Sequence, residues 1–173
     1  MPENDAAIAA IDRFIAEQAI DRNQTDWKTR LPRPPQADFE ASKRYFWNIA
    51  TNLGDLKIQL MPDIAPMHVS STIYLARLGF YDGVIFHRVI TGFMAQGGDP
   101  KGNGTGGSGV NIPAEFSGEP HVRGTLSMAR SSDPDSADSQ FFIVFSRSRF
   151  LDGKYTVWGQ VTKGMKHVGK IKR

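Results

Sequence analysis

Five short apolar segments, separated by turns rich in glycine, limit what the second half of this chain can fold into. They lie at residues 83–90, 93–98, 124–130, 140–145 and 154–161. Each has the length of a strand and is too short for a typical helix. Glycine and polar residues between the segments are typical of turns. The segments therefore predict a mainly β domain, with its sheet closed into a barrel or folded into a sandwich.

Two further strands and two helices are expected around these segments. Residues 45–62 predict a pair of strands joined at "NLGD", because apolar residues alternate after that turn. Residues 63–79 predict a helix, with Pro66 in its first turn and Gly79 at its C-terminal end. The basic segment 163–173 predicts a terminal helix.

The N-terminal part of the chain has a different pattern. Residues 5–20 repeat isoleucine and alanine at helical spacing, which predicts one amphipathic helix that packs on the main domain or contacts a partner. Residues 21–42 contain "RLPRPPQ", and its prolines disfavour helix, so an irregular linker is expected. We therefore divide the chain into an N-terminal extension, 1–42, and a main domain, 43–173.

Composition excludes several classes of protein. Hydrophobic residues make up 40% of the chain, which is enough for a packed core, and no apolar run is long enough to span a membrane. The formal net charge of +3 is small and the basic residues are scattered, so nucleic-acid binding is not expected. The absence of cysteine excludes disulfides, thiolate metal sites and cysteine nucleophiles.

The first ten residues, "MPENDAAIAA", are acidic and lack the basic and apolar regions of a secretory leader. Location in the cytoplasm is therefore expected. A chain whose leader had been removed would look the same, so the periplasm and secretion stay open as alternatives.

The glycine-rich stretch "GNGTGG", residues 102–107, matches the loose pattern of a dinucleotide-binding loop. Such a loop must open a helix, whose N-terminus holds the phosphates. Gly109 and Pro113 oppose a helix directly after the stretch, and no G-K-[ST] sequence is present. We interpret it instead as a surface loop in which glycine permits positive φ angles and leaves the surface bare for something that lies across it.

The sequence does not support a metal site or the nucleophilic serine of a hydrolase. The four histidines lack metal-ligand spacing, and the serines lack a G-x-S-x-G turn. The acidic stretch 132–139 has Asp138 where an EF-hand needs glycine and Val144 where it needs glutamate. No metal and no cofactor are therefore expected.

The adjacent residues Phe141 and Phe142 indicate that the sheet has a second apolar surface besides the core. In a strand, successive side chains point to opposite faces, so the core can take only one of this pair. The other is expected to line a second surface, in a group with the polar residues Arg88, Gln96 and Gln140.

Taken together, "GFYDGVIFHRVITGFMAQGGDP", "GNGTGG", "GTLSMAR", "SQFFIVF" and "LDGKYTVWGQV" resemble the cyclophilin family of peptidyl-prolyl cis-trans isomerases. The five segments occur in family order, and the resemblance covers residues 45–173. It implies an eight-stranded antiparallel β-barrel capped by two helices, here with an extra N-terminal helix. It also implies an enzyme that accelerates rotation about X-Pro bonds in peptides and folding proteins.

The resemblance also implies the site residues. Arg88 matches the catalytic arginine. The substrate-binding positions are His87, Phe93, Met94, Gln96, Gly104, Ala129, Arg130, Ser131, Gln140, Phe142, Phe150, Leu151 and Tyr155. Within that set, Phe93, Met94, Phe142 and Leu151 match the pocket for the proline ring, and Gly104, Ala129, Arg130 and Ser131 match the groove for the residues before proline. No cofactor is implied.

The sequence departs from the family pattern at three of these positions. Phe150 stands where many eukaryotic members have tryptophan, Tyr155 replaces a histidine, and Arg130 replaces an asparagine. Phenylalanine and tyrosine there resemble bacterial members. The missing indole donor predicts weak cyclosporin binding. The loop 131–139 is one residue longer than usual, which is expected to alter the far wall of the groove.

Family members continue after the last helix into a strand that closes the barrel, whereas this sequence stops at "KIKR". We therefore expect the final barrel strand to be missing and the chain to be truncated relative to its gene. An alternative is that part of residues 21–44 covers the gap.

The expected partners are proline-containing peptides and unfolded protein clients, without nucleic acid or membrane, and the chain is expected to be a monomer. A second function class stays open: a proline-peptide binding module or chaperone with weak catalysis. It would use the same groove, but the presence of Arg88 beside an intact pocket favours the enzyme.

Overall fold

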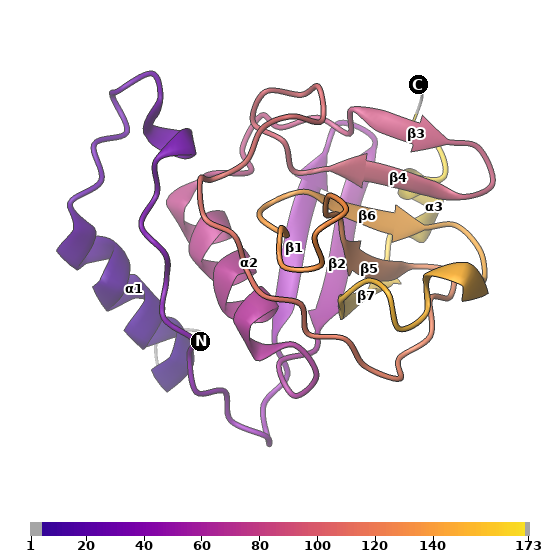
Figure 1. The fold of residues 1–173 in the computed structure, drawn as a ribbon, viewed down its shortest axis with the longest axis horizontal. Helices are drawn as coiled ribbons and strands as arrows, with labels where there is room; N and C mark the ends of the chain where they lie inside the picture. Colours follow the sequence, from indigo (N-terminus) through magenta and orange to yellow (C-terminus); the bar gives the residue numbers. More distant parts are fainter. Residues whose placement is uncertain (1–4, 172–173) are drawn as a thin grey trace.

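One antiparallel sheet forms the body of the molecule, which the computed structural model describes from residue 5 to residue 171. Its strands follow the order β1-β2-β7-β5-β6-β4-β3 (Figure 1). In chain order they are β1 (Phe46–Thr51), β2 (Gly54–Leu60), β3 (Arg88–Ile90), β4 (Met94–Gly97), β5 (Thr125–Met128), β6 (Phe141–Val144) and β7 (Val157–Lys163). The mainly β class is confirmed. The described residues supply seven strands of the expected eight, so the sheet is an open half-barrel with β1 and β3 at its edges.

Two expectations about the strands are wrong. The apolar segment 83–90 is a strand only from Arg88, because Gly83 takes a positive φ of 75° and the Val84 amide donates to the Tyr81 carbonyl, which makes a turn there. Residues 21–44 add no strand to the sheet, so this segment does not close the barrel.

Helix α2 (Pro66–Leu78) is buried along most of its length and supplies one side of the core. It begins at Pro66, three residues after the predicted start at residue 63, and ends at Gly79, which has a φ of 80°. Pro66 in the first turn and Gly79 at the C-terminal end agree with the prediction. The other side of the core comes from the sheet, where Leu56, Ile58 and Trp158 are almost fully buried.

Helix α1 (Ala6–Gln18) runs along the outer side of α2 (Figure 1). Ile11 is fully buried in the main core, and Arg77 of α2 makes two hydrogen bonds to the Asp12 carboxylate, at 2.5 and 2.7 Å. The N-terminal helix therefore packs on the main domain, one of the two alternatives that its sequence left open.

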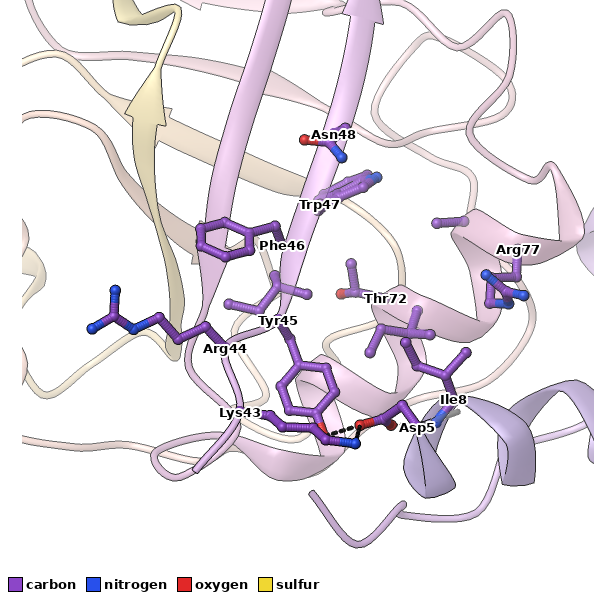
Figure 2. Close-up of a pocket in the computed structure, with 13 residues that line it drawn as sticks. Asp5, Ile8, Lys43, Arg44, Tyr45, Phe46, Trp47, Asn48, Thr72 and Arg77 are labelled. Atoms are coloured by element: carbon purple, nitrogen blue, oxygen red, sulfur yellow. Dashed lines mark hydrogen bonds and ion pairs between the residues drawn. The ribbon is translucent and has the colours of Figure 1, made fainter. Parts of the chain in front are cut away.

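The start of α1 is fixed by Asp5 (Figure 2). Its carboxylate caps the helix by accepting the Ile8 amide at 3.0 Å, and it also accepts the Tyr45 hydroxyl at 2.7 Å. Lys43 lies 3.2 Å from the same carboxylate. Asp5 thus connects α1 to the residues that lead into β1, beside a cavity of about 690 Å³ between β1, α1 and α2.

The remaining helices are short. Besides the 3-10 turns η2 (Trp27–Thr29) and η3 (Arg149–Leu151), the chain has α3 (Met165–Val168). The sequence predicts a helix over residues 163–173, and that prediction is too long: Lys163 ends β7, Gly164 has a φ of 89°, and residues 172–173 lie outside the described part. Between residues 5 and 171, no helix is both long and apolar enough to cross a membrane.

Candidate functional site

Three side chains from three neighbouring strands share one face of the sheet. In the antiparallel register, Arg88 of β3 lies opposite Gln96 of β4, and Gln96 lies opposite Phe142 of β6. Residues directly opposite one another project from the same face. The register therefore places a guanidinium, an amide and an aromatic ring in one row.

A pocket of about 170 Å³ opens beside this row. Its floor is apolar: Met94 and Phe142 are 3% and 6% exposed, and both belong to a small buried cluster separate from the main core. The pocket is lined by Arg88, Phe93, Met94, Gln96, Ala129, Arg130, Phe142, Leu151 and Tyr155. All nine are among the residues predicted from the sequence.

The two adjacent phenylalanines divide as their alternation requires. Phe141 packs in the main core, edge-to-face with Trp47, Tyr81 and Phe86. Phe142 faces the pocket, edge-to-face with Tyr155 at 5.7 Å. The inference that one of the pair lines a second surface is confirmed.

The side chains of Gln96 and Gln140 form a hydrogen-bond network that leads from the Arg88 row to the glycine loop. The Gln96 side-chain amide donates to the Gln140 carbonyl oxygen at 2.9 Å. Gln140 in turn donates to the carbonyls of Gly104 and Gly106, at 3.0 and 2.8 Å. Gln140 is therefore occupied in holding the glycine loop, whereas the Gln96 carbonyl oxygen accepts no hydrogen bond from the described residues and is free for Arg88 or a ligand.

A second, larger pocket of about 520 Å³ continues from the first. The two share Gln96, Ala129 and Arg130. Its lining includes Gly104, Ser131 and Gln140, as predicted, and also residues that sequence reasoning missed: Thr29, Lys101, Thr105, Gly106, Gly107, Gly109, Asn111, Ser136 and Asp138. Together the two pockets form a continuous groove.

The glycine loop is organised by Asp99, which is 1% exposed. Its carboxylate accepts the amides of Lys101, Asn103 and Gly104 at 2.8, 3.1 and 2.6 Å. Burial raises the pKa of Asp99, but hydrogen bonds from the backbone amides outweigh burial, so the net pKa lies below its ordinary value.

The backbone conformation of Gly104 explains why glycine occupies this position, because its φ of 93° is unfavourable for residues with a side chain. A Cβ there would lie 3.7 Å from the His87 ring, so space alone does not require glycine.

Replacing Asp99 with alanine should destabilise the groove wall. Three amides of the loop would lose their acceptor, at a cost of about 1–3 kcal/mol. We expect Asp99→Ala to lower the free energy of unfolding in urea by that amount. Asp133→Ala is the matched control, because among the described residues the exposed Asp133 side chain accepts only the local Asp135 amide. Equal stability of Asp99→Ala and Asp133→Ala would contradict the role given to Asp99.

Beneath the Phe142 ring lies His121, which is fully buried and was not predicted as a site residue. The two rings stack at 6.3 Å with an interplanar angle of 14°. The imidazole contacts the Asp152 carboxylate at 3.0 Å and the Ser127 hydroxyl at 2.8 Å. Because Asp152 directly follows Leu151, this network connects the floor of the pocket to its side wall. Arg147 donates to the same carboxylate at 2.7 Å.

Burial lowers the pKa of His121, and Arg147 lowers it further, against the opposing effect of Asp152. The folded pKa therefore lies below the ordinary value of 6.5. Between those two values the unfolded chain binds more protons, so stability falls as the pH decreases below about 6.5. We expect the melting temperature to fall between about pH 7 and pH 5.5, above the ordinary pKa range of carboxylates, and the slope to be smaller in His121→Gln. An unchanged slope in that variant would contradict this assignment.

Two predicted residues line neither pocket. His87 lies beside Gly104 at the edge of the groove; burial lowers its pKa, Asp99 raises it and Arg88 lowers it, with a net decrease. Phe150 is 63% exposed and leans on Phe93, with ring centroids 5.3 Å apart. Both residues therefore flank the groove.

The chemistry of the groove follows from this arrangement. The small pocket suits a compact apolar ring, and Arg88 stands at its rim as a hydrogen-bond donor that stays charged. The Arg88 guanidinium makes no hydrogen bond to the residues between 5 and 171. It is therefore free to donate to a group that a bound ligand presents there.

Comparisons with known proteins agree with this geometry. Residues 46–173 match the family model described as "Cyclophilin type peptidyl-prolyl cis-trans isomerase/CLD". A protein of Brucella suis biovar 1 (strain 1330), named "Probable peptidyl-prolyl cis-trans isomerase", is 55% identical over 132 residues, covering 69% of this chain and 67% of the relative. The peptidyl-prolyl cis-trans isomerase of Helicobacter pylori (strain ATCC 700392 / 26695) is 44% identical over 138 residues, covering 78% and 84%.

Solved structures give the same result. A cyclophilin-type peptidyl-prolyl cis-trans isomerase from Cryptosporidium parvum superposes with a TM-score of 0.69 at 35% identity, covering 74% of this chain and 86% of that chain. The same Cryptosporidium protein, crystallised in the presence of the dipeptide Ala-Pro, gives a TM-score of 0.70, covering 74% and 87%. Residues 5–45 precede the family match.

Proposed function

This chain belongs to the cyclophilin family of peptidyl-prolyl cis-trans isomerases, and we propose that Arg88 is the residue by which it isomerises X-Pro bonds in unfolded protein chains. The observation that carries this assignment is the row formed by Arg88, Gln96 and Phe142 at the mouth of an apolar pocket. The row unites a charged donor with a site for the proline ring.

The reaction needs a twisted amide. Rotation about the C–N bond has a barrier of about 18–20 kcal/mol, because the planar amide is stabilised by resonance. No covalent bond has to be broken, so neither a nucleophile nor a leaving group is required. The enzyme must bind the twisted amide more tightly than either planar form.

Arg88 is placed to favour that twisted state. As the amide loses its resonance, the proline nitrogen becomes pyramidal and regains a lone pair, which can accept a hydrogen bond. A guanidinium offers a rigid set of donors and stays charged at every relevant pH. We assign Arg88 to donate to this nitrogen, with the free Gln96 carbonyl oxygen across the strand pair to orient the guanidinium.

The apolar pocket holds the ring while the rest of the peptide turns. Met94, Phe142 and Leu151 are all at most 6% exposed and leave space for a small ring. A buried ring excludes water from Arg88, which strengthens the hydrogen bond in the twisted state. In this proposal the apolar side chains bind the proline ring, and Arg88 in the same groove provides catalysis.

The proposed substrates are exposed X-Pro segments of protein chains, bound by a monomer. The Cryptosporidium relative crystallised in the presence of Ala-Pro supports a proline-containing ligand in this groove. The exposed Phe150 ring lacks an indole N–H, which supports weak cyclosporin binding.

Refolding kinetics test the proposed substrate class. A protein whose slow refolding phase is limited by X-Pro isomerisation should refold faster with catalytic amounts of this chain, and Arg88→Ala should remove the effect. A binding module would instead leave the slow phase unchanged at low concentration and retard it at equimolar concentration. That outcome would favour the alternative of a chaperone with weak catalysis.

A further inference from the structure

The second pocket carries two positive charges, and neither of them forms an ion pair with a described carboxylate. Arg130 and Lys101 both line it, and neither forms an ion pair within residues 5–171. One carboxylate, Asp138, is in the lining. Its oxygens accept hydrogen bonds from the Ser108 amide and hydroxyl and from the Gly109 amide, which fix the carboxylate without neutralising it. The described lining therefore carries two positive charges against one negative charge.

The guanidinium of Arg130 is held in place without losing its charge. It donates to the Lys154 carbonyl at 3.1 and 2.7 Å and to the Ser131 carbonyl at 2.9 Å. It also lies over the Tyr155 ring, 4.6 Å from the centroid. Carbonyls and a π face fix the orientation of the cation but do not neutralise it. Arg130 lines both pockets, so its charge stands between them.

A wall of the same pocket comes from outside the region that matches the family. Thr29, at the end of η2, lines it. The segment is firmly docked: the Leu31 amide donates to the Ser108 carbonyl at 3.0 Å, and the Tyr74 hydroxyl donates to the Pro32 carbonyl at 2.9 Å. A Cβ on Gly109 would lie only 2.5 Å from the Thr29 carbonyl oxygen, so extension and glycine loop are in close contact.

From these observations we propose that the second pocket selects peptides with an acidic side chain a few residues from the isomerising proline. Lys101 and Arg130 attract the carboxylate, and Thr29 of the N-terminal extension closes the pocket around it. The inference rests on the proposed function, since it assumes that the proline ring occupies the neighbouring small pocket. It deepens that function by naming a substrate class.

Matched peptides test the selectivity. Acetyl- and amide-capped peptides would carry one glutamate or one glutamine at the second or third position before the proline, so that charge is the only difference. We expect kcat/KM for the best glutamate peptide to exceed that of its glutamine partner by about three- to tenfold at low salt. About 0.5 M salt should reduce this ratio, because the interaction lies at the surface.

Three variants locate the charge effect. Lys101→Gln and Arg130→Gln should each lower the glutamate-to-glutamine ratio toward one. Thr29→Glu should lower it further by placing a like charge in the wall. The control Lys163→Gln removes one positive charge from the end of β7, outside both pockets, and should leave the ratio unchanged. Thermal melts would establish that each variant is folded.

The outcomes are distinguishable. Turnover of the glutamine peptides with a ratio near one in the wild type would overturn the acidic selectivity while leaving the isomerase function intact. A ratio that falls equally in Lys163→Gln would show an effect of net charge and would also overturn it. An unchanged glutamate-to-glutamine ratio in folded Thr29→Glu would contradict the proposed role of the N-terminal extension in this pocket. Absence of turnover with every peptide would instead count against the proposed function.

Discussion

Arg88→Ala should lower kcat/KM on an X-Pro peptide by about 100-fold or more, the loss typical for removing one donor to a transition state. The side chain is exposed and makes no hydrogen bond to the described residues, so folding does not depend on it. The melting temperature should therefore stay within about 1–2 °C of the wild type, as for other exposed positions. A protease-coupled assay and a thermal melt measure the two quantities.

A second exposed arginine, two residues before Leu151 of the small pocket, gives the matched control. Arg149 in η3 is exposed and lines neither pocket, so Arg149→Ala removes the same charge near the groove without removing the proposed donor. Arg88→Lys tests the guanidinium itself, because lysine keeps the charge but lacks the rigid fork of donors. Rates for Arg88→Ala within about twofold of the wild type would contradict the assignment of Arg88 as the catalytic donor. The rates for Arg149→Ala are expected to stay within that range.

Phe142→Ala should have the largest effect on ligand binding. The ring is 6% exposed and packs on His121, Tyr155 and the buried pocket floor, so its loss removes one wall of the proline pocket. We expect peptide affinity to fall by about tenfold or more, corresponding to roughly 1.4 kcal/mol. The folded state should also lose about 3–5 kcal/mol, the usual cost of deleting a buried phenylalanine.

The adjacent residue separates these two effects. Phe141→Ala deletes the same side chain from the opposite face, where it packs on Trp47, Tyr81 and Phe86. It should cost similar stability but leave peptide affinity close to that of the wild type at a temperature where both variants are folded. Equal loss of affinity in the two variants would mean that the binding defect comes from destabilisation and not from the pocket.

The sequence predicts the strands and the pocket well where local patterns decide them. Alternation in "QFFIVF" separates Phe141 from Phe142, and Pro66 and Gly79 mark the ends of α2 where the structure has them. The resemblance supplies all nine residues of the small pocket, because the family motifs contain these positions. The register of β3, β4 and β6 accounts for four of them, Arg88, Met94, Gln96 and Phe142, and the other five lie outside these three strands.

Long-range contacts account for most of what the sequence does not predict. Thr29 reaches the second pocket because Leu31 and Pro32 dock on partners far along the chain, and no local pattern encodes that contact. His121 is a lone histidine before a strand, and only the folded chain places it under Phe142. Asp99 had a local signal, an acid directly before a glycine-rich loop, which is typical of a side chain that accepts loop amides.

The division between the N-terminal extension and the main domain remains a prediction. The described part of the extension contributes Ile11 and Leu31 to the main core and Thr29 to the groove. The packing of α1 on the main domain was one of the two alternatives that the sequence left open, whereas the contribution of Thr29 to the groove was not expected from the sequence.

Exchange NMR on a short X-Pro peptide tests whether this chain isomerises the bond through Arg88, because it reports binding and isomerisation in one sample. With a small fraction of the wild-type chain, we expect exchange cross-peaks between the cis and trans forms of the peptide, and with Arg88→Ala we expect line broadening or shifts from binding without those cross-peaks. Binding by the wild type without cis–trans exchange would contradict the isomerase activity, and full exchange with Arg88→Ala would contradict the catalytic role of Arg88.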